Sequence, residues 1–202
     1  MTRFTFPPSI ASRPVWGTLL PRKGTAFLMI ADAEGAEALI DLAKAAPDLM
    51  AAADVVYLPK GTGTRFSDAL RAAGPGTLYI GPSFDAAEPR IKRMLADARM
   101  GLQIFLTGTE GLMGRAMALA LAAGTPVDAI QTEHRGSVAR RMQCVHCKGF
   151  TEDVMTDPFV CAHCGLNLFV RDHYSRRFGA YQGVCVDAED PGVIPPQKEL
   201  YS

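Results

Sequence analysis

The sequence lacks several features that would place it in common classes of protein. No uninterrupted apolar run reaches the roughly 18 residues that a membrane-spanning helix needs. The first eight residues, MTRFTFPP, contain no apolar stretch of a signal peptide. Basic and acidic residues number 21 each, so no overall field favours nucleic acid or an anionic membrane. We therefore expect a cytoplasmic protein with no membrane and no nucleic acid among its partners.

Motifs of common enzymes are missing as well. No H-E-x-x-H motif, Ser-His-Asp order or carboxylate pair stands out in the sequence. Residues 60–65 (KGTGTR) hold two glycines but lack the Gly-Lys-Ser/Thr ending of a P-loop, which favours an ordinary glycine turn over a phosphate site. We expect no catalytic residue in this chain.

What the sequence does contain is two C-x-x-C pairs. Cys144 and Cys147 form the first pair, Cys161 and Cys164 the second, and residues 148–160 separate them. Each pair can turn its backbone so that both sulfurs face one point, and two facing turns form a tetrahedral four-thiolate site. Because nothing indicates secretion, a bound metal is favoured over disulfides.

The metal is expected to be zinc or a mononuclear iron, since both accept four thiolates. The short spacer between the pairs is more usual for a zinc ribbon than for a rubredoxin, and it favours zinc. Four thiolates leave no open coordination position, so the metal is expected to be structural or electron-carrying. His146 and His163, inside the pairs, are expected at the surface, and Cys185 is expected to be a packed thiol.

An arm and a regular domain precede the cysteines. Residues 1–24, rich in proline and glycine, predict an extended arm with one short strand at 15–20. Apolar runs of strand length then alternate with helical periodicity. The predicted strands are 25–31, 53–58, 76–80, 102–107 and 129–132, and the predicted helices are 32–46, 66–73, 85–98 and 110–123.

This alternation predicts an α/β fold, a parallel sheet flanked by helices. The expected organisation is the arm (1–24), an α/β domain (25–138), and a four-cysteine, ribbon- or rubredoxin-like module with its tail (139–202).

Residues 105–133 resemble the end of the nicotinamide domain of ferredoxin reductases. In that family a strand leads to Cys-Gly-Pro and a helix, followed by G-V-P-x-x-x-I-x-x-E. Here Thr107-Gly108 stands where Cys-Gly is usual, Thr109 replaces the proline, and residues 124–133 (GTPVDAIQTE) match the second run. The resemblance covers residues 25–135 and implies a reductase-like domain.

The turn after the first predicted strand departs from a nucleotide site. Residues 32–37 read DAEGAE, so Gly35 is the single glycine, and three acids lie where phosphates would bind: Asp32, Glu34 and Glu37. We expect these acids to cap the following helix. The domain is therefore expected to keep the reductase shape without a cofactor-binding residue.

The tail carries the most specific resemblance. Residues 170–177 (VRDHYSRR) and 180–184 (AYQGV), with the two cysteine pairs, resemble the small DmmA-type (gamma) subunit of bacterial dimethylamine monooxygenase over the full length. That family uses NADPH and oxygen to convert dimethylamine to methylamine and formaldehyde. The resemblance implies an accessory subunit, with a heme-bearing oxygenase subunit and a flavin/iron–sulfur reductase subunit as partners. Heme, FMN and the iron–sulfur cluster are expected on those partners only.

Two hypotheses for the function stay open. The first is a partner-docking subunit of this oxidoreductase, with or without electron transfer through a four-thiolate iron. Its candidate partner contacts are Arg171, His173, Tyr174, Arg176 and Arg177; the alternative for this cluster is a surface turn with internal ion pairs to Asp172 or Asp187. The second hypothesis is a stand-alone zinc-ribbon interaction module.

Overall fold

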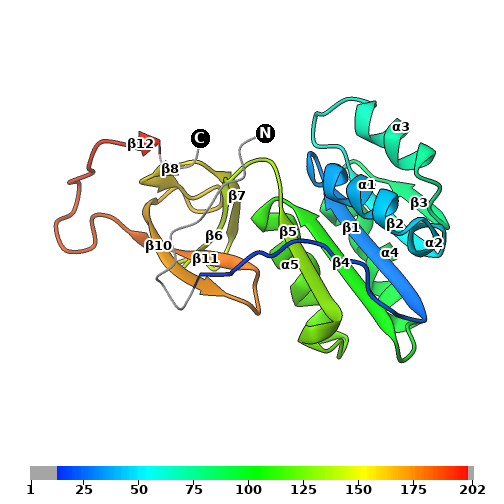
Figure 1. The fold of residues 1–202 in the computed structure, drawn as a ribbon. Helices are drawn as coiled ribbons and strands as arrows, with labels where there is room; N and C mark the ends of the chain where they lie inside the picture. The colour runs from blue at the N-terminus through cyan, green and yellow to red at the C-terminus, as the bar shows by residue number, and fades with distance from the viewer. Residues whose placement is uncertain (1–12, 200–202) are drawn as a thin grey trace. The chain divides into compact units, whose positions relative to one another are not determined.

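The computed structural model describes residues 13–199, and the chain divides into two compact units (Figure 1). Trp16–Gly136 form the first, here called the α/β unit. Of the remaining described residues, 13–15 and 137–199 form the second, here called the ribbon unit. The α/β unit is therefore inserted in sequence between two parts of the ribbon unit.

A five-stranded parallel sheet forms the centre of the α/β unit, as the sequence predicts. Its inner strands are near-continuous apolar runs because helices cover both faces. From β1 the chain adds β2 and β3 on one side of the sheet and then β4 and β5 on the other, so the strand order reverses between the neighbours β1 and β4. In sheet order the strands are β3 (Thr77–Ile80), β2 (Ala53–Leu58), β1 (Ala26–Asp32), β4 (Leu102–Gly108) and β5 (Ile130–His134).

Two hydrophobic cores lie on the two faces of this sheet. Neighbouring residues on β1 point to opposite faces, so Met29 joins one core and Ile30 the other. The first core is covered by α1 (Gly35–Ala45), α2 (Pro47–Ala51) and α3 (Arg65–Ala72). The second is covered by α4 (Phe84–Ala96) and α5 (Glu110–Ala122), and a 3-10 turn, η1 (Val127–Ala129), leads into β5.

The short strand predicted at residues 15–20 is wrong. This segment runs beside β5 without joining the sheet. The N–H of Gly17 donates to the carbonyl of Thr132 at 2.9 Å, but the N–H of Leu19 donates to the Glu133 carboxylate at 2.7 Å. Side-chain acceptors on β5 thus replace the backbone ladder that would define a strand.

The helix predicted at residues 32–46 is shorter at both ends. Ala33 has a φ of 42°, which delays α1 until Gly35. At the other end, Pro47 disfavours helical backbone at Ala46. α1 therefore ends at Ala45, and a second helix, α2, begins at Pro47.

The ribbon unit contains a second five-stranded sheet. Its order is β7 (Phe150–Val154), β6 (Arg140–Cys144), β11 (Ala180–Cys185), β10 (Asn167–Ser175) and β9 (Phe159–Val160). β6 and β11 are parallel and the other neighbours are antiparallel. A separate pair joins β8 (Thr156–Asp157) to β12 (Lys198–Glu199).

The core of the ribbon unit is small. Its largest buried side chains include Met142, Phe159, Leu168 and Tyr181, and two of the metal-site cysteines also belong to it. A core of this size supplies little stability, so units of this kind need an additional source of stability such as a bound metal.

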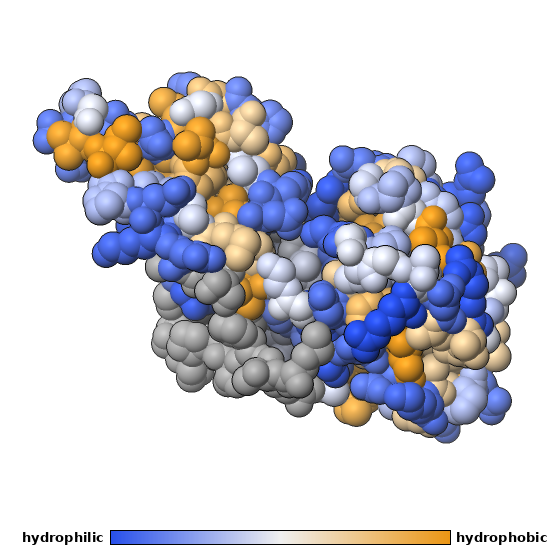
Figure 2. All heavy atoms as spheres, turned by 90° about the horizontal axis from the view of Figure 1, so that it is seen from above, coloured by the Kyte–Doolittle hydropathy of each residue, from blue (hydrophilic) through white to orange (hydrophobic). Residues whose placement is uncertain are grey.

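Hydrophilic side chains interrupt the hydrophobic ones on the molecular face drawn in Figure 2. Among the described residues, no helix is both long and apolar enough to cross a membrane.

Candidate metal centre

Two equivalent turns, here called knuckles, carry the four cysteines. In the first, between β6 and β7, the N–H of Lys148 donates to the carbonyl of Cys144 at 2.9 Å. In the second, between β9 and β10, the N–H of Gly165 donates to the carbonyl of Cys161 at 3.0 Å. The N–H of the first cysteine closes each knuckle: that of Cys144 donates to the carbonyl of Gly149, and that of Cys161 to the carbonyl of Leu166. The same backbone turn therefore presents both C-x-x-C pairs.

Each knuckle needs a left-handed backbone position directly after its second cysteine. Gly165 fills this position in the second knuckle with a φ of 74°. In the first knuckle Lys148 fills it with a φ of 64°, one position before Gly149. A lysine is strained there, whereas glycine adopts this region freely.

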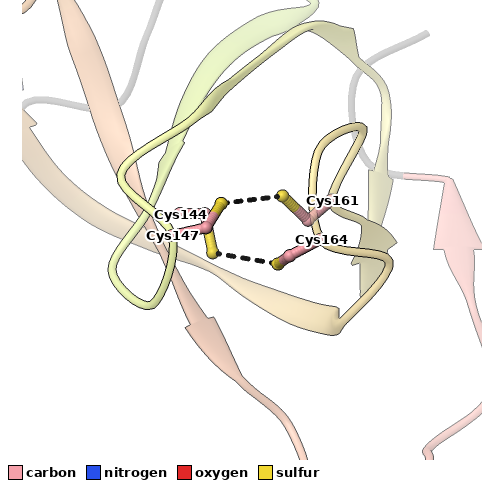
Figure 3. Close-up of side chains that lie close together, drawn as sticks. All are labelled: Cys144, Cys147, Cys161 and Cys164. Carbon is pink, nitrogen blue, oxygen red and sulfur yellow. Dashed lines mark hydrogen bonds between the residues drawn. The ribbon is translucent and has the colours of Figure 1, made fainter.

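The four sulfurs form a cluster of the size that a tetrahedral metal requires (Figure 3). All four lie within 4.8 Å of one another. The sulfurs of Cys144 and Cys164 are 3.8 Å apart, and those of Cys147 and Cys161 are 3.7 Å apart. A metal with sulfur bonds of about 2.3 Å has tetrahedral edges of about 3.8 Å, while a disulfide would need about 2.05 Å. The cysteines are thus arranged to hold a metal ion and form no disulfide.

Hydrogen bonds prepare one sulfur for the thiolate form. Burial alone would raise the pKa of Cys161, but the backbone N–H groups of Cys164 and His163 bring it down to about 6. For Cys164, the N–H of Leu166 lowers the pKa, but burial and the hydrogen bonds of the other sulfurs outweigh it and raise it to about 12. The cluster therefore shares its protons unequally, and a metal ion would displace them.

One of the two histidines joins the knuckles to each other. His163 is exposed, as expected, yet its Nε2 donates to the carbonyl of Phe150 at 2.8 Å, directly after the first knuckle. A Cβ on Gly149 would lie 2.5 Å from this imidazole. Gly149 thus serves the close approach of His163, and not the left-handed turn.

In the α/β unit, Asp32 lies at the carboxyl end of the central strand β1, at the switch point between β1 and β4. Its carboxylate accepts hydrogen bonds from the N–H of Thr109 at 2.8 Å and from the Thr109 hydroxyl at 2.6 Å, and Lys60 Nζ lies 3.5 Å away. A Cβ on Gly108 would fall 1.9 Å from this carboxylate. Burial raises the pKa of Asp32, against the opposing effect of these hydrogen bonds.

The expectation that these acids cap α1 holds by position for Glu34, at the N-cap, and for Glu37, in the first turn, but it is wrong for Asp32. Asp32 binds the first residues of α5 instead, where Thr109 is the N-cap. Glu34 stands at the N-cap of α1 without a side-chain hydrogen bond, and Glu37 lies 3.9 Å from both Arg65 and Arg135. The replacement of the motif's proline by Thr109 could have indicated this contact. Proline has no N–H, whereas Thr109 has one to donate to Asp32.

Comparison with known proteins places the chain in a family. Residues 8–130 match the N-terminal domain, and residues 141–184 the C-terminal domain, of the family described as "Dimethylamine monooxygenase subunit DmmA-like". The chain belongs to this DmmA-like family.

A curated relative supports the same assignment. It is the "Heme-dependent oxidative N-demethylase delta subunit" of Ectopseudomonas mendocina (strain ymp), 36% identical over 154 residues, which are 72% of this chain and 87% of the relative. Its subunit letter is delta, where the sequence resemblance suggested gamma.

Among solved structures, phthalate dioxygenase reductase is similar with a TM-score of 0.46 and 14% identity. The match covers 68% of this chain and 46% of that structure, so the chain spans less than half of its length. Similarity at this level has no bearing on activity.

The structure divides the cation–aromatic cluster of the DmmA-like tail. Arg171, His173, Arg176 and Arg177 are exposed. Tyr174 is half-buried, with its ring packed edge-on against Tyr181 at 5.0 Å.

Neither acid expected to neutralise this cluster does so. Asp172 accepts hydrogen bonds from Arg13 and Arg140, and Asp187 accepts them from the Cys185 thiol and the N–H of Gly192. Within residues 13–199, no carboxylate forms an ion pair with Arg171, Arg176 or Arg177. The internal neutralisation considered from the sequence is therefore wrong.

Proposed function

We propose that this DmmA-like chain is an accessory, partner-docking subunit of an oxidative N-demethylase acting on dimethylamine. The overall reaction would consume dimethylamine, oxygen, NADPH and a proton, and give methylamine, formaldehyde, water and NADP⁺. The family description and the name of the curated relative support this assignment. A heme-bearing oxygenase subunit and a flavin/iron–sulfur reductase subunit are the proposed partners.

The closed cysteine cluster carries the proposal that the chain is accessory. Four thiols at tetrahedral spacing use every coordination position of a bound metal, so neither substrate nor oxygen has a place on it. In the α/β unit, the buried carboxylate of Asp32 lies where a nucleotide phosphate would bind in a fold of this class. Chemistry and nucleotide binding are therefore assigned to the partners.

Zinc is the proposed metal, and it would tie the two knuckles of the small ribbon core together. A mononuclear iron is the second candidate, since Cys147 is exposed and Cys164 half-buried, which leaves one side of the cluster open to electron exchange. Elemental analysis of protein purified without added metal separates the two. An iron-loaded chain would also absorb visible light, whereas a zinc-loaded chain would be colourless.

Reconstitution tests the function. The chain is co-expressed with the other subunits of its N-demethylase, and formaldehyde release is measured with dimethylamine, NADPH and oxygen. We expect turnover by the full set, none by this chain alone, and loss of turnover without it. Full activity in its absence would refute the accessory role, as would micromolar binding of NADPH to the isolated chain in calorimetry.

A further inference from the structure

The turn between β10 and β11 combines exposed cations with an exposed aromatic ring. Arg176, Arg177 and Phe178, here called the arginine turn, are all exposed, and 40% of Phe178 is accessible. The turn is closed by backbone hydrogen bonds from Phe178 and Gly179 to the carbonyl of Ser175, at 3.2 and 2.8 Å. Its side chains therefore project from an ordered backbone.

The side chain of Arg141 holds this turn in place by bonding to its backbone. Its side chain is 11% exposed, its Nε donates to Glu152 at 2.7 Å, and its Nη1 donates to the carbonyl of Phe178. The guanidinium also lies 3.9 Å from the centre of the Phe150 ring. Arg141 thus connects β6, β7 and the arginine turn, and it is a positioning residue for the turn.

The same contacts connect the arginine turn to the metal centre. The rings of Phe150 and Phe178 are 6.2 Å apart. Phe150 follows the first knuckle, and its carbonyl accepts the hydrogen bond from His163 of the second knuckle. The arginine turn and both knuckles therefore meet around one residue, Phe150.

The charge of this surface is not balanced within the described part of the chain. Arg177 lies 5.5 Å from the centre of the Phe178 ring, and Arg171 lies 5.7 Å from that of Phe169. Their nearest acidic neighbour in sequence, Asp172, is committed to Arg13 and Arg140, whose hydrogen bonds outweigh its burial and lower its pKa. Guanidinium groups bind carboxylates as a fork, and an adjoining aromatic ring is typical of protein interfaces.

We propose that the arginine turn binds a carboxylate-rich patch on a partner protein of the N-demethylase. This inference rests on the proposed docking function and assigns it to one surface. A protein is favoured over nucleic acid because the whole chain has zero formal net charge and the cationic surface is short. The docked acidic patch would lie beside the knuckles, because Phe150 joins the two.

The test compares charge variants of the chain co-expressed with the other subunits. Arg176→Glu/Arg177→Glu reverses the charge, and Arg176→Lys/Arg177→Lys preserves it. Arg93→Glu/Arg99→Glu is the matched control, since both residues are exposed and belong to the α/β unit. The dissociation constant is measured at low and high salt, with metal content and thermal unfolding as checks on folding.

We expect the reversed pair to weaken binding roughly tenfold or more at low salt, while the control stays close to wild type. The lysine pair should weaken binding less than the reversed pair, because lysine keeps the charge but loses the guanidinium fork. The difference should shrink at high salt, because exposed charges are screened beyond roughly 3 Å at 1 M. Equal dissociation constants for all variants would overturn the inference and leave the docking function intact.

Two other outcomes are also decisive. If the wild-type chain binds none of the subunits, the docking function itself fails and the inference fails with it. If the arginine turn instead binds a duplex oligonucleotide in a mobility-shift assay, and the reversed pair abolishes this, the partner is nucleic acid and the inference is overturned.

Discussion

Gly165 and Lys148 occupy the same backbone position in the two knuckles, and they meet its conformational demand differently. Both have a positive φ, at 74° and 64°. Around Gly165 nothing lies within 4 Å of an added Cβ. The cost of a side chain there is therefore conformational and not steric.

Replacing Gly165 with alanine should lower the free energy of unfolding of the ribbon unit by about 1–2 kcal/mol. Gly165→Asn should cost less, because asparagine tolerates the left-handed region. Urea unfolding of the metal-loaded chain measures both. Equal losses for the two substitutions would show that crowding, and not backbone conformation, sets the cost.

His163 and His146 occupy the same place within the two cysteine pairs. Among residues 13–199, His163 donates a hydrogen bond to the carbonyl of Phe150 beside the opposite knuckle, and His146 makes no such bond. His163→Ala should speed metal release to a chelator roughly fivefold, the effect of losing a hydrogen bond of about 1 kcal/mol. His146→Ala is the matched control and should leave the rate near wild type. The measurement is the rate of metal transfer to a coloured chelator at constant pH. Similar rates for the two variants would contradict the role of His163.

Among the structural elements, β1 and α5 are tied together by one carboxylate. Asp32 at the end of β1 binds the backbone and the hydroxyl of Thr109 at the N-cap of α5. Both residues depart from the reductase pattern. Asp32 supplies the hydrogen-bond acceptor, and Thr109 supplies the N–H that a proline would lack. Gly108 between them leaves room for the carboxylate.

Thr109→Val should lower the free energy of unfolding of the α/β unit by about 2–4 kcal/mol, from one cap and one hydrogen bond to a buried charge. Ser83→Ala at the N-cap of α4 is the control, since it removes a cap alone and should cost about 1 kcal/mol. Equal losses in urea unfolding would show that the bond to Asp32 contributes nothing.

The pH dependence of this pair has a definite sign. Burial raises the pKa of Asp32 in the folded state, so its ionisation costs stability as the pH rises from the ordinary carboxyl pKa to the folded one. The valine substitution removes a bond that favours the charged form. The loss from Thr109→Val should therefore shrink as the pH falls through the pKa of Asp32.

Local patterns account for what could be predicted of these elements. The β2 bounds and the fold class follow from apolar runs and helical periodicity, because a strand covered on both faces must be apolar throughout. The four-thiol cluster follows from spacing alone. The bond from Asp32 to Thr109 spans 77 residues and the one from His163 to Phe150 crosses between knuckles, so no local pattern contains them.

For the whole molecule, the two units have different sources of stability. The α/β unit has two extended hydrophobic cores, whereas the ribbon unit has one small core that includes two cysteines of the metal site. The binding free energy of a structural metal is largely folding free energy, about 10–16 kcal/mol for zinc in small fingers.

Removing the metal should therefore unfold the ribbon unit and leave the α/β unit folded. Calorimetry of the chain with a chelator, or of Cys161→Ser, should lose one heat-absorption peak and keep the other. Cys185→Ser is the control, because this thiol lies outside the cluster and donates to Asp187. Loss of both peaks on chelation would show that the two units do not unfold independently.

The position of Arg13 has a consequence for the order of events on the ribosome. Its partner in the ribbon unit, Asp172, is 159 residues further along the chain. At a synthesis rate of roughly 5–20 residues per second, Arg13 is translated about 8–32 seconds before Asp172. All of the inserted α/β unit is made within that interval. The ion pair between Arg13 and Asp172 therefore cannot form until the whole α/β unit and much of the ribbon unit have been synthesised.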